Sequence, residues 1–164
     1  MRKNIFDLAK EVFDLASINR ELIASAESCT GGMLSSAITE IPGSSTIFEC
    51  GFVTYSNMSK VKLLSVNEST LHHHGAVSEE VAGEMAIGAL KNSQASLAIS
   101  ITGIAGPGGS VTKPEGMVCF SIACESEIKL TETKNWGSIG RDRVRETATL
   151  HGLQLLSRTL NARI

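Results

Sequence analysis

The sequence predicts an α/β fold, a three-layer αβα sandwich around a mixed, mostly parallel sheet of about five strands. Two observations support this prediction. Short, mostly apolar runs at 22–26 and 97–101, each with one serine, have the length and composition of strands buried on both faces of a sheet. Segments with apolar residues at helical spacing alternate with these runs. With 164 residues and neither a linker nor an internal repeat, the chain is expected to form one domain over 1–164.

The first half of the chain reads as alternating helices and strands. Asn4 can cap the first helix, Pro42-Gly43 ends the second, and Gly75 closes the fourth. The second strand is placed on a stretch rich in β-branched and aromatic residues. In order, the expected elements are helix 5–18, strand 22–26, helix 33–41, strand 46–55 and helices 57–64 and 68–74.

The second half is expected to hold one more parallel strand and a hairpin. Ser78 can cap a helix whose first turn contains Glu79 and Glu80, a favourable place for negative charge. Two β-rich segments separated by 125–127 are expected to pair antiparallel. In order, the elements are a helix from 79 to about 90, strands 97–101, 116–124 and 128–136, and a helix from 138 or 140 to 161.

Composition limits the classes of function. The formal charge of -2 and an aromatic content of 4% argue against a nucleic-acid partner. The sequence contains no run of eighteen apolar residues, so no membrane span is predicted. Charged residues near the start interrupt any apolar core of a signal peptide. The four cysteines lack CxxC spacing, so we expect reduced thiols in a cytoplasmic protein with no metal site.

Two glycine-bearing segments each follow a predicted strand. The first, 27–32, has the sequence ESCTGG, and the second, 102–109, has the sequence TGIAGPGG. Ligands of open α/β sheets bind at the carboxyl ends of parallel strands, where loops lead into helices. The two segments together therefore predict a cradle for an anionic or carbonyl group.

Ser28 lies between a strand and a helix, a suitable place for an acyl-transfer nucleophile. The first N–H groups of the following helix lack intrahelical partners and can stabilise an oxyanion. The alternative is that Ser28 or Thr30 only caps that helix. Cys29 is a rival nucleophile, and the segment does not match the GxSxG pattern.

The sequence offers few bases for this serine. His72, His73 and His74 are adjacent, so their side chains diverge on a helix and do not form a preorganised metal site. Tyr55 and Lys60 lie at a strand-to-helix junction, and a lysine acts as a base when burial lowers its pKa. Spacing alone does not bring Lys60 to Ser28, and the alternative for Lys60 is a solvated helix residue.

The second glycine segment and the last helix suggest recognition of phosphate. Residues 102–109 match neither a P-loop nor the GxGxxG pattern, although their backbone donors can hold an anion. Arg141 and Arg145 are four residues apart and can share a helix face, whereas Arg143 points elsewhere. Either of the first two can clamp a phosphate, and the alternative is plain surface charge.

These motifs, taken together and in order, resemble the CinA C-terminal domain family, whose stand-alone members include nicotinamide-nucleotide amidases. The resemblance covers nearly the whole chain. It rests on 26–32 (AESCTGG), 42–45 (PGSS), 51–57 (GFVTYSN), 74–78 (HGAVS), 100–109 (SITGIAGPGG), 113–116 (KPEG), and Gly140-Arg141 with Arg145.

The resemblance implies hydrolysis of nicotinamide mononucleotide to nicotinate mononucleotide and ammonia, without a cofactor, by a homo-oligomer. Carried over residue by residue, Ser28 is the nucleophile and Tyr55 and Lys60 are the candidates for its activation. The implied substrate-binding residues are Thr30, Gly31, Gly32, Thr102, Gly103, Ala105, Gly106, Arg141 and Arg145. The alternative function is a catalytically silent nucleotide-binding or interaction module linked to competence or DNA damage.

Overall fold

The computed structural model describes residues 4–163, so the outermost residues of the predicted domain, 1–3 and 164, lie outside the described part. The predicted element order is confirmed, with one short 3-10 turn added. In chain order the elements are α1 (Ile5–Asn19), β1 (Ile23–Glu27), α2 (Met33–Thr39), η1 (Ser44–Thr46), β2 (Phe48–Val53), α3 (Asn57–Leu64), α4 (Glu68–His74), α5 (Glu79–Lys91), β3 (Leu97–Gly103), β4 (Met117–Cys124), β5 (Glu127–Asn135) and α6 (Arg141–Asn161).

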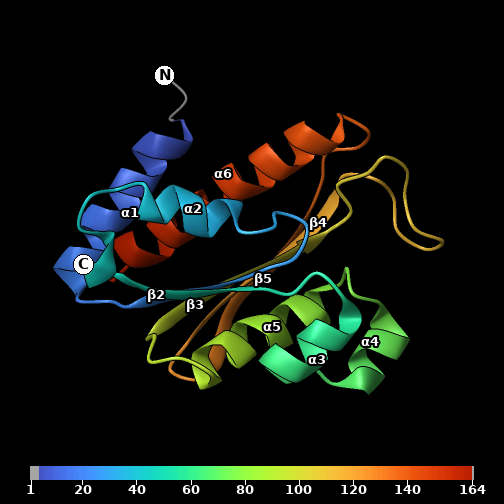
Figure 1. Ribbon diagram of the computed structural model, residues 1–164, viewed down its shortest axis with the longest axis horizontal. Helices are drawn as coiled ribbons and strands as arrows, with labels where there is room; N and C mark the ends of the chain where they lie inside the picture. Colours follow the sequence, from blue (N-terminus) through green and yellow to red (C-terminus); the bar gives the residue numbers. More distant parts are fainter. Residues whose placement is uncertain (1–3, 164) are drawn as a thin grey trace.

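The elements form three layers. Helices α1, α2 and α6 cover one face of the sheet, and α3, α4 and α5 cover the other (Figure 1). One apolar core, which includes Leu34, Ile99 and Leu153, lies under the first group of helices. A second core, which includes Ala98 and Met85, lies under the other group. The predicted αβα sandwich is therefore confirmed.

The sheet is mixed, as predicted, with the strand order β2-β1-β3-β4-β5. Strand β1 pairs in parallel with β2 and β3, whereas β4 is antiparallel to both β3 and β5. Four of the five strands consequently point the same way. Because β2, β1 and β3 are parallel neighbours, the chain leaves all three at the same edge of the sheet, and this edge holds the candidate site.

Most predicted element ends agree with the structure to within two residues, and β2 differs most. The predicted strand 46–55 is shorter because Thr46 belongs to a 3-10 turn, where its N–H and its hydroxyl both donate to the carbonyl of Gly43. At the other end, Ser56 caps α3 by accepting from the N–H of Ser59. Polar groups at both ends of the segment thus form local hydrogen bonds, and these bonds compete with pairing in the sheet.

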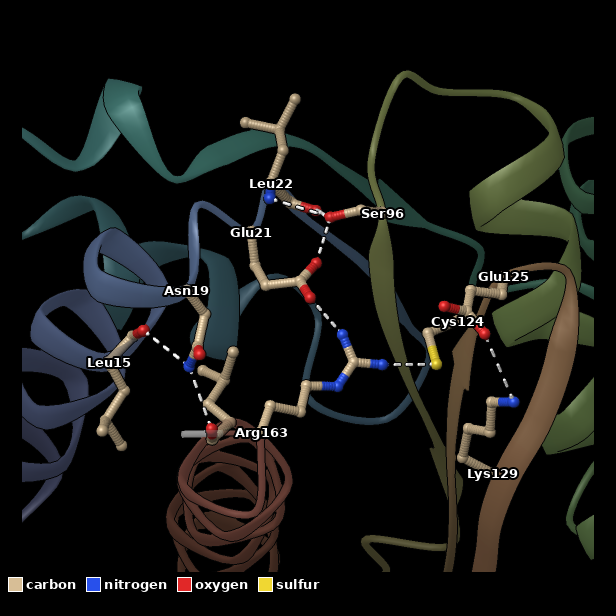
Figure 2. A network of polar contacts seen from close by, with 10 residues as sticks. Leu15, Asn19, Glu21, Leu22, Ser96, Cys124, Glu125, Lys129 and Arg163 are labelled. Atoms are coloured by element: carbon tan, nitrogen blue, oxygen red, sulfur yellow. Dashed lines mark hydrogen bonds and ion pairs between the residues drawn. The ribbon is translucent and has the colours of Figure 1, made fainter.

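The edge of the sheet opposite the site is joined to the helices by a polar network (Figure 2). The carboxylate of Glu21 contacts both the hydroxyl of Ser96 and the guanidinium of Arg163. Arg163 also donates to the Sγ atom of Cys124, at the end of β4. Asn19 donates to the carbonyl of Leu160, which joins α1 to α6. These contacts anchor the end of α6, whose first turn lies at the candidate site.

In the described part of the chain, no helix is long and apolar enough to cross a membrane.

Gly88 provides a test of the packing between α3 and α5. A Cβ atom at this position would lie 1.9 Å from the carbonyl oxygen of Leu64, which belongs to the backbone. Replacing glycine by alanine inside a helix ordinarily stabilises it by about 0.5–1 kcal/mol. Because the clash is with backbone, we expect Gly88→Ala to lower the free energy of unfolding by about 2–3 kcal/mol instead. Urea denaturation measures this change.

The matched control is Gly83→Ala in the same helix. There the added Cβ atom would meet the Cδ1 atom of Ile128 at 2.6 Å, the far end of a flexible side chain. We therefore expect a smaller loss for Gly83→Ala than for Gly88→Ala. Equal stability of Gly88→Ala and the parent protein would contradict the close packing of α5 on the end of α3.

Candidate active site

A pocket of about 400 Å³ opens at the edge of the sheet where β1, β2 and β3 end. This volume is within the range that small-molecule sites occupy. The structure brings eight of the predicted site residues together around it: Ser28, Tyr55, Lys60, Thr102, Gly103, Ala105, Gly106 and Arg141.

A serine and a lysine are in direct contact at the base of this pocket. Ser28 directly follows β1, and its N–H donates to the carbonyl of Ile101 on β3 at 2.9 Å, which extends the sheet by one residue. Lys60 lies in the first turns of α3 and is only 1% exposed. Its Nζ atom lies 3.0 Å from the Oγ atom of Ser28 and 2.8 Å from the carbonyl oxygen of Thr54. Lys60 is therefore a buried partner of Ser28 and not a solvated helix residue.

Burial prepares Lys60 to act as a base. Desolvation disfavours the charged ammonium and lowers the pKa of Lys60 from 10.5 to about 8. None of the described residues forms a salt bridge with Lys60 that would restore the charged form. A neutral amine 3.0 Å from a serine hydroxyl can accept its proton.

Cys29, the rival nucleophile, also lines the pocket but is held in its unreactive form. Burial raises the pKa of its thiol to about 12, with a smaller contribution from the negative charge of Glu27. The thiolate is the nucleophilic form of cysteine. At neutral pH the Cys29 thiol is therefore protonated, and Ser28 is the better candidate.

Tyr55 and Arg141 form one wall of the pocket. Nη2 of Arg141 donates to the Tyr55 hydroxyl at 2.7 Å, and Nη1 donates to the carbonyl of Gly106 at 2.8 Å. These bonds join the start of α6 to the end of β2 and to the second glycine segment. Tyr55 is 62% exposed, and among the described residues its only hydrogen bond is the one to Arg141. Lys60 is consequently placed better than Tyr55 to take a proton from Ser28.

The second glycine segment forms a further part of the pocket wall, next to Arg141. Thr102 donates to the carbonyl of Ala76, which fixes the end of β3 against the chain before α5. Gly106 has a φ of +87°, and a Cβ atom there would lie 2.5 Å from the Glu115 carboxyl group. Glu115 in turn accepts a hydrogen bond from the N–H of Gly108. Sequence reasoning gave Glu115 no role, whereas the structure shows that it shapes this wall.

The predicted use of the α2 N-terminus as an oxyanion site is wrong. The buried carboxylate of Glu27 accepts hydrogen bonds from three backbone N–H groups of α2 and its N-cap, those of Gly32, Leu34 and Ser35, and from the hydroxyl of Ser35. A carboxylate is well suited to this position because the helix N-terminus carries partial positive charge. These donors are therefore not free for a substrate. The only sequence signal for this role of Glu27, as acceptor for the N–H groups of α2, is that an acidic residue directly precedes the glycine-bearing turn.

Four residues predicted to bind substrate lie outside the pocket wall: Thr30, Gly31, Gly32 and Arg145. Thr30 is fully buried, and its hydroxyl has no partner among the described residues. Nε of Arg145 donates to the carbonyl of Cys29 at 3.1 Å and Nη2 to that of Thr30 at 3.2 Å. Because Arg145 does not line the pocket, whereas Arg141 does, Arg145 is the weaker candidate for phosphate.

The histidines lie away from the Ser28–Lys60 pair. His72, His73 and His74 border a separate hollow together with Lys113, and the ring of His151 contacts the carboxylate of Glu132. No group of three metal-binding side chains occurs within residues 4–163.

Comparison with known proteins shows the family to which the chain belongs. The family model described as the CinA C-terminal domain matches residues 5–160. The chain belongs to the CinA C-terminal domain family. A relative in this family, the nicotinamide-nucleotide amidohydrolase PncC of Escherichia coli K12, is 47% identical over 153 residues, which are 93% of this chain and 92% of the relative. A longer relative, a putative competence-damage inducible protein of Caldicellulosiruptor saccharolyticus, is 48% identical over 84% of this chain but only 33% of its own length.

Solved structures of CinA proteins have the same fold. The competence/damage inducible protein CihA of Agrobacterium tumefaciens superposes with a TM-score of 0.91 at 39% identity, over 98% of each chain. A CinA superfamily protein of Klebsiella pneumoniae superposes with a TM-score of 0.93 at 31% identity, over 98% of this chain and 99% of that one.

Proposed function

We propose that this chain hydrolyses the carboxamide of nicotinamide mononucleotide to give nicotinate mononucleotide and ammonia. The observation that carries the proposal is the contact between Ser28 and the buried Lys60 in a pocket of suitable size. The proposal is supported by the 47% identity to an enzyme named nicotinamide-nucleotide amidohydrolase over nearly the full length of both chains. Lys60 has a lowered pKa next to a candidate nucleophile, which is typical of active sites.

The proposed reaction proceeds by acyl transfer. Neutral Lys60 takes the proton of the Ser28 hydroxyl as Oγ forms a bond to the carboxamide carbon. The tetrahedral intermediate then collapses, the carbon–nitrogen bond breaks, and the Lys60 ammonium gives its proton to the departing nitrogen, which leaves as ammonia. A water molecule attacks the resulting ester with Lys60 again as the base. The products are nicotinate mononucleotide and free Ser28.

The charge of the pocket fits an anionic substrate. Its described wall contains two cationic side chains, those of Lys60 and Arg141, and no acidic one. Lys60 is buried against Ser28 and Thr54, whereas Arg141 is exposed on the pocket wall, so Arg141 is the candidate for the substrate phosphate. The guanidinium presents donors in a planar fork that matches a phosphate. The Gly103–Gly106 segment would contribute backbone around the substrate.

Arg141→Gln tests this assignment. Loss of a charge-assisted contact of about 1.5–3 kcal/mol should raise KM for nicotinamide mononucleotide by about 10- to 100-fold and change kcat much less. Nicotinamide riboside lacks the phosphate, so its kinetics should differ little between the parent enzyme and the variant. Arg143→Gln, which changes an exposed arginine on the same helix, is the matched control. Equal losses on both substrates would exclude a phosphate contact and assign Arg141 a structural role through Tyr55 and Gly106.

The direct test of the proposal is release of ammonia from nicotinamide mononucleotide by the purified protein. We expect stoichiometric ammonia and nicotinate mononucleotide without any added metal or cofactor. Tight nucleotide binding without ammonia release would instead favour the silent binding module.

Sedimentation of the same preparation tests the predicted homo-oligomer, and a gel-shift titration tests the predicted absence of nucleic-acid binding.

A further inference from the structure

We propose that residues 107–115, which connect β3 to β4, are a lid that closes over the active-site pocket. This lid loop is bordered by Gly106 and Gly116, and in Figure 1 the connection extends away from the three layers. Closure would retain the bound nucleotide during the reaction. The identity of that nucleotide rests on the proposed function, whereas the lid itself rests on the contacts of the loop.

The pocket is buried at its base and exposed at its mouth. Ser28 and Lys60 at the base are buried, whereas Tyr55 and Asn57, which also line the pocket, are exposed. The first half of the lid loop, 107–110, lines the pocket too and is exposed throughout. Enzymes commonly close such a mouth with a loop, which keeps the ligand in place.

Hydrogen bonds within the lid loop hold it together as one unit. The N–H of Gly108 donates to the carboxylate of Glu115 at 2.6 Å, which joins the two sides of the loop. Nearer the tip, the N–H of Ser110 donates to the carbonyl of Lys113 at 2.8 Å, and the N–H of Lys113 donates to the hydroxyl of Ser110 at 3.1 Å. The loop therefore keeps its own shape when it moves.

The lid loop has almost no hydrogen bonds to the rest of the molecule. Among residues 4–163, its one such bond to another element runs from the N–H of Met117 to the carbonyl of Pro114 at 3.3 Å, at its own end. The residues that border the loop are glycines with φ values of +87° at Gly106 and +82° at Gly116. Glycine adopts such conformations readily and can absorb the backbone change of a hinge.

The tip of the lid loop is apolar, and so are two side chains near the pocket mouth. Val111 is fully exposed, and Tyr55 and Met58 are each more than half exposed. Arg141 bridges the hydroxyl of Tyr55 and the carbonyl of Gly106, so the loop begins beside Tyr55. Val111 is five residues further along, and five residues span up to about 17 Å, so the tip can reach both side chains. Burial of this apolar surface favours the closed form.

A disulfide between the tip and the mouth tests closure directly. Val111→Cys and Met58→Cys are combined with Ser28→Ala, so that the nucleotide is not consumed, and with Cys50→Ser, which removes the one native thiol that is not buried. The bond forms only when the two Cα atoms come within about 7 Å. With oxidised glutathione as the oxidant, we expect nicotinamide mononucleotide to raise the rate of disulfide formation by about tenfold or more.

The matched control pair uses Leu63→Cys in place of Met58→Cys. Leu63 lies on the same helix, α3, further from its start, and is about as exposed as Met58. This pair should react slowly with or without the nucleotide. Equal rates for the two pairs would mean that the loop is merely flexible and would overturn the lid. Complete reaction of the Met58 pair at one rate, with or without nucleotide, would overturn it in an enzyme that releases ammonia.

A second test uses Val111→Ser in an otherwise unchanged enzyme. Because Val111 is fully exposed in this structure, its loss should leave the open form unaffected and weaken only the closed one. We expect KM for nicotinamide mononucleotide to rise by about tenfold and kcat to stay within about twofold. Ile18→Ser, which changes an exposed apolar side chain on α1, should alter neither. An unchanged KM in Val111→Ser would contradict closure by the apolar tip.

Closure and catalysis are tested separately in these experiments. A protein that closes on its ligand also visits the closed form without it, so the Met58 pair should react faster than the Leu63 pair even in the free protein. If this preference is present but the parent protein releases no ammonia, the substrate is wrong and the lid stands. If ammonia is released but neither pair is preferred, with or without the nucleotide, the lid alone is rejected.

Discussion

Ser28→Ala is expected to lower kcat for deamidation on the order of 10⁴-fold or more, because the variant has no atom that can form the acyl bond. KM or the dissociation constant for nicotinamide mononucleotide should change little, since Arg141 and the glycine segments are untouched. The side chain of Ser28 is small, and its N–H bond to Ile101 remains, so the melting temperature should stay close to that of the parent. Ammonia release and isothermal titration with the nucleotide measure the two effects.

Two companion variants make this result specific. Ser36→Ala changes an exposed serine on α2 and should keep the parent rate. Cys29→Ala removes a thiol whose pKa of about 12 keeps it protonated, so it should retain a readily measurable rate. A dead Cys29→Ala beside an active Ser28→Ala would transfer the nucleophile to Cys29 and refute the assignment.

Lys60→Met is expected to lower kcat by about 10²- to 10⁴-fold, the usual contribution of a positioned general base. Lys60→Arg should be nearly as inactive, because a guanidinium stays protonated and cannot accept the Ser28 proton. Lys62→Met, in the same helix but exposed, is the matched control and should keep the parent rate. A fully active Lys60→Arg would limit Lys60 to an electrostatic role and return Tyr55 to consideration as the base.

The pH dependence follows from the lowered pKa of Lys60. The neutral amine is the active form, and it becomes more abundant as the pH rises through about 8. At pH 7 only about a tenth of the molecules carry it. We therefore expect kcat/KM to rise about tenfold per pH unit below 7 and to level off above about 8.5. A rate that falls over this range would mean that the charged lysine is the active form.

The sequence predicts the fold well because the strongest signals are local. The apolar runs of β1 and β3 are too short for helices and carry no polar residue that faces solvent, so they mark buried parallel strands. The caps Asn4 and Ser78 are also local and are both confirmed. The end of β2 could not be placed in the same way. There the Gly43–Thr46 turn competes with the strand, and the segment's β-propensity does not decide between them.

The candidate site is predicted only in part because contacts within it depend on sheet register. Ser28 could be found from its place after a buried strand. Lys60 is 32 residues further along the chain, and the two meet because β1 and β2 are parallel neighbours that end together. The same dependence hides the contacts of Arg145, since nothing local indicates that α6 crosses the turn at Cys29 and Thr30.

Trapping with hydroxylamine tests the central claim, an acyl-enzyme intermediate on Ser28, most directly. Hydroxylamine is a stronger nucleophile than water and attacks an ester to give a hydroxamate. With nicotinamide mononucleotide as substrate, we predict that the hydroxamate of nicotinate mononucleotide forms at the expense of nicotinate mononucleotide, in proportion to the hydroxylamine concentration. Ser28→Ala should form none. Ammonia release that yields only nicotinate mononucleotide at every hydroxylamine concentration would show that water attacks the carboxamide directly and would contradict the account.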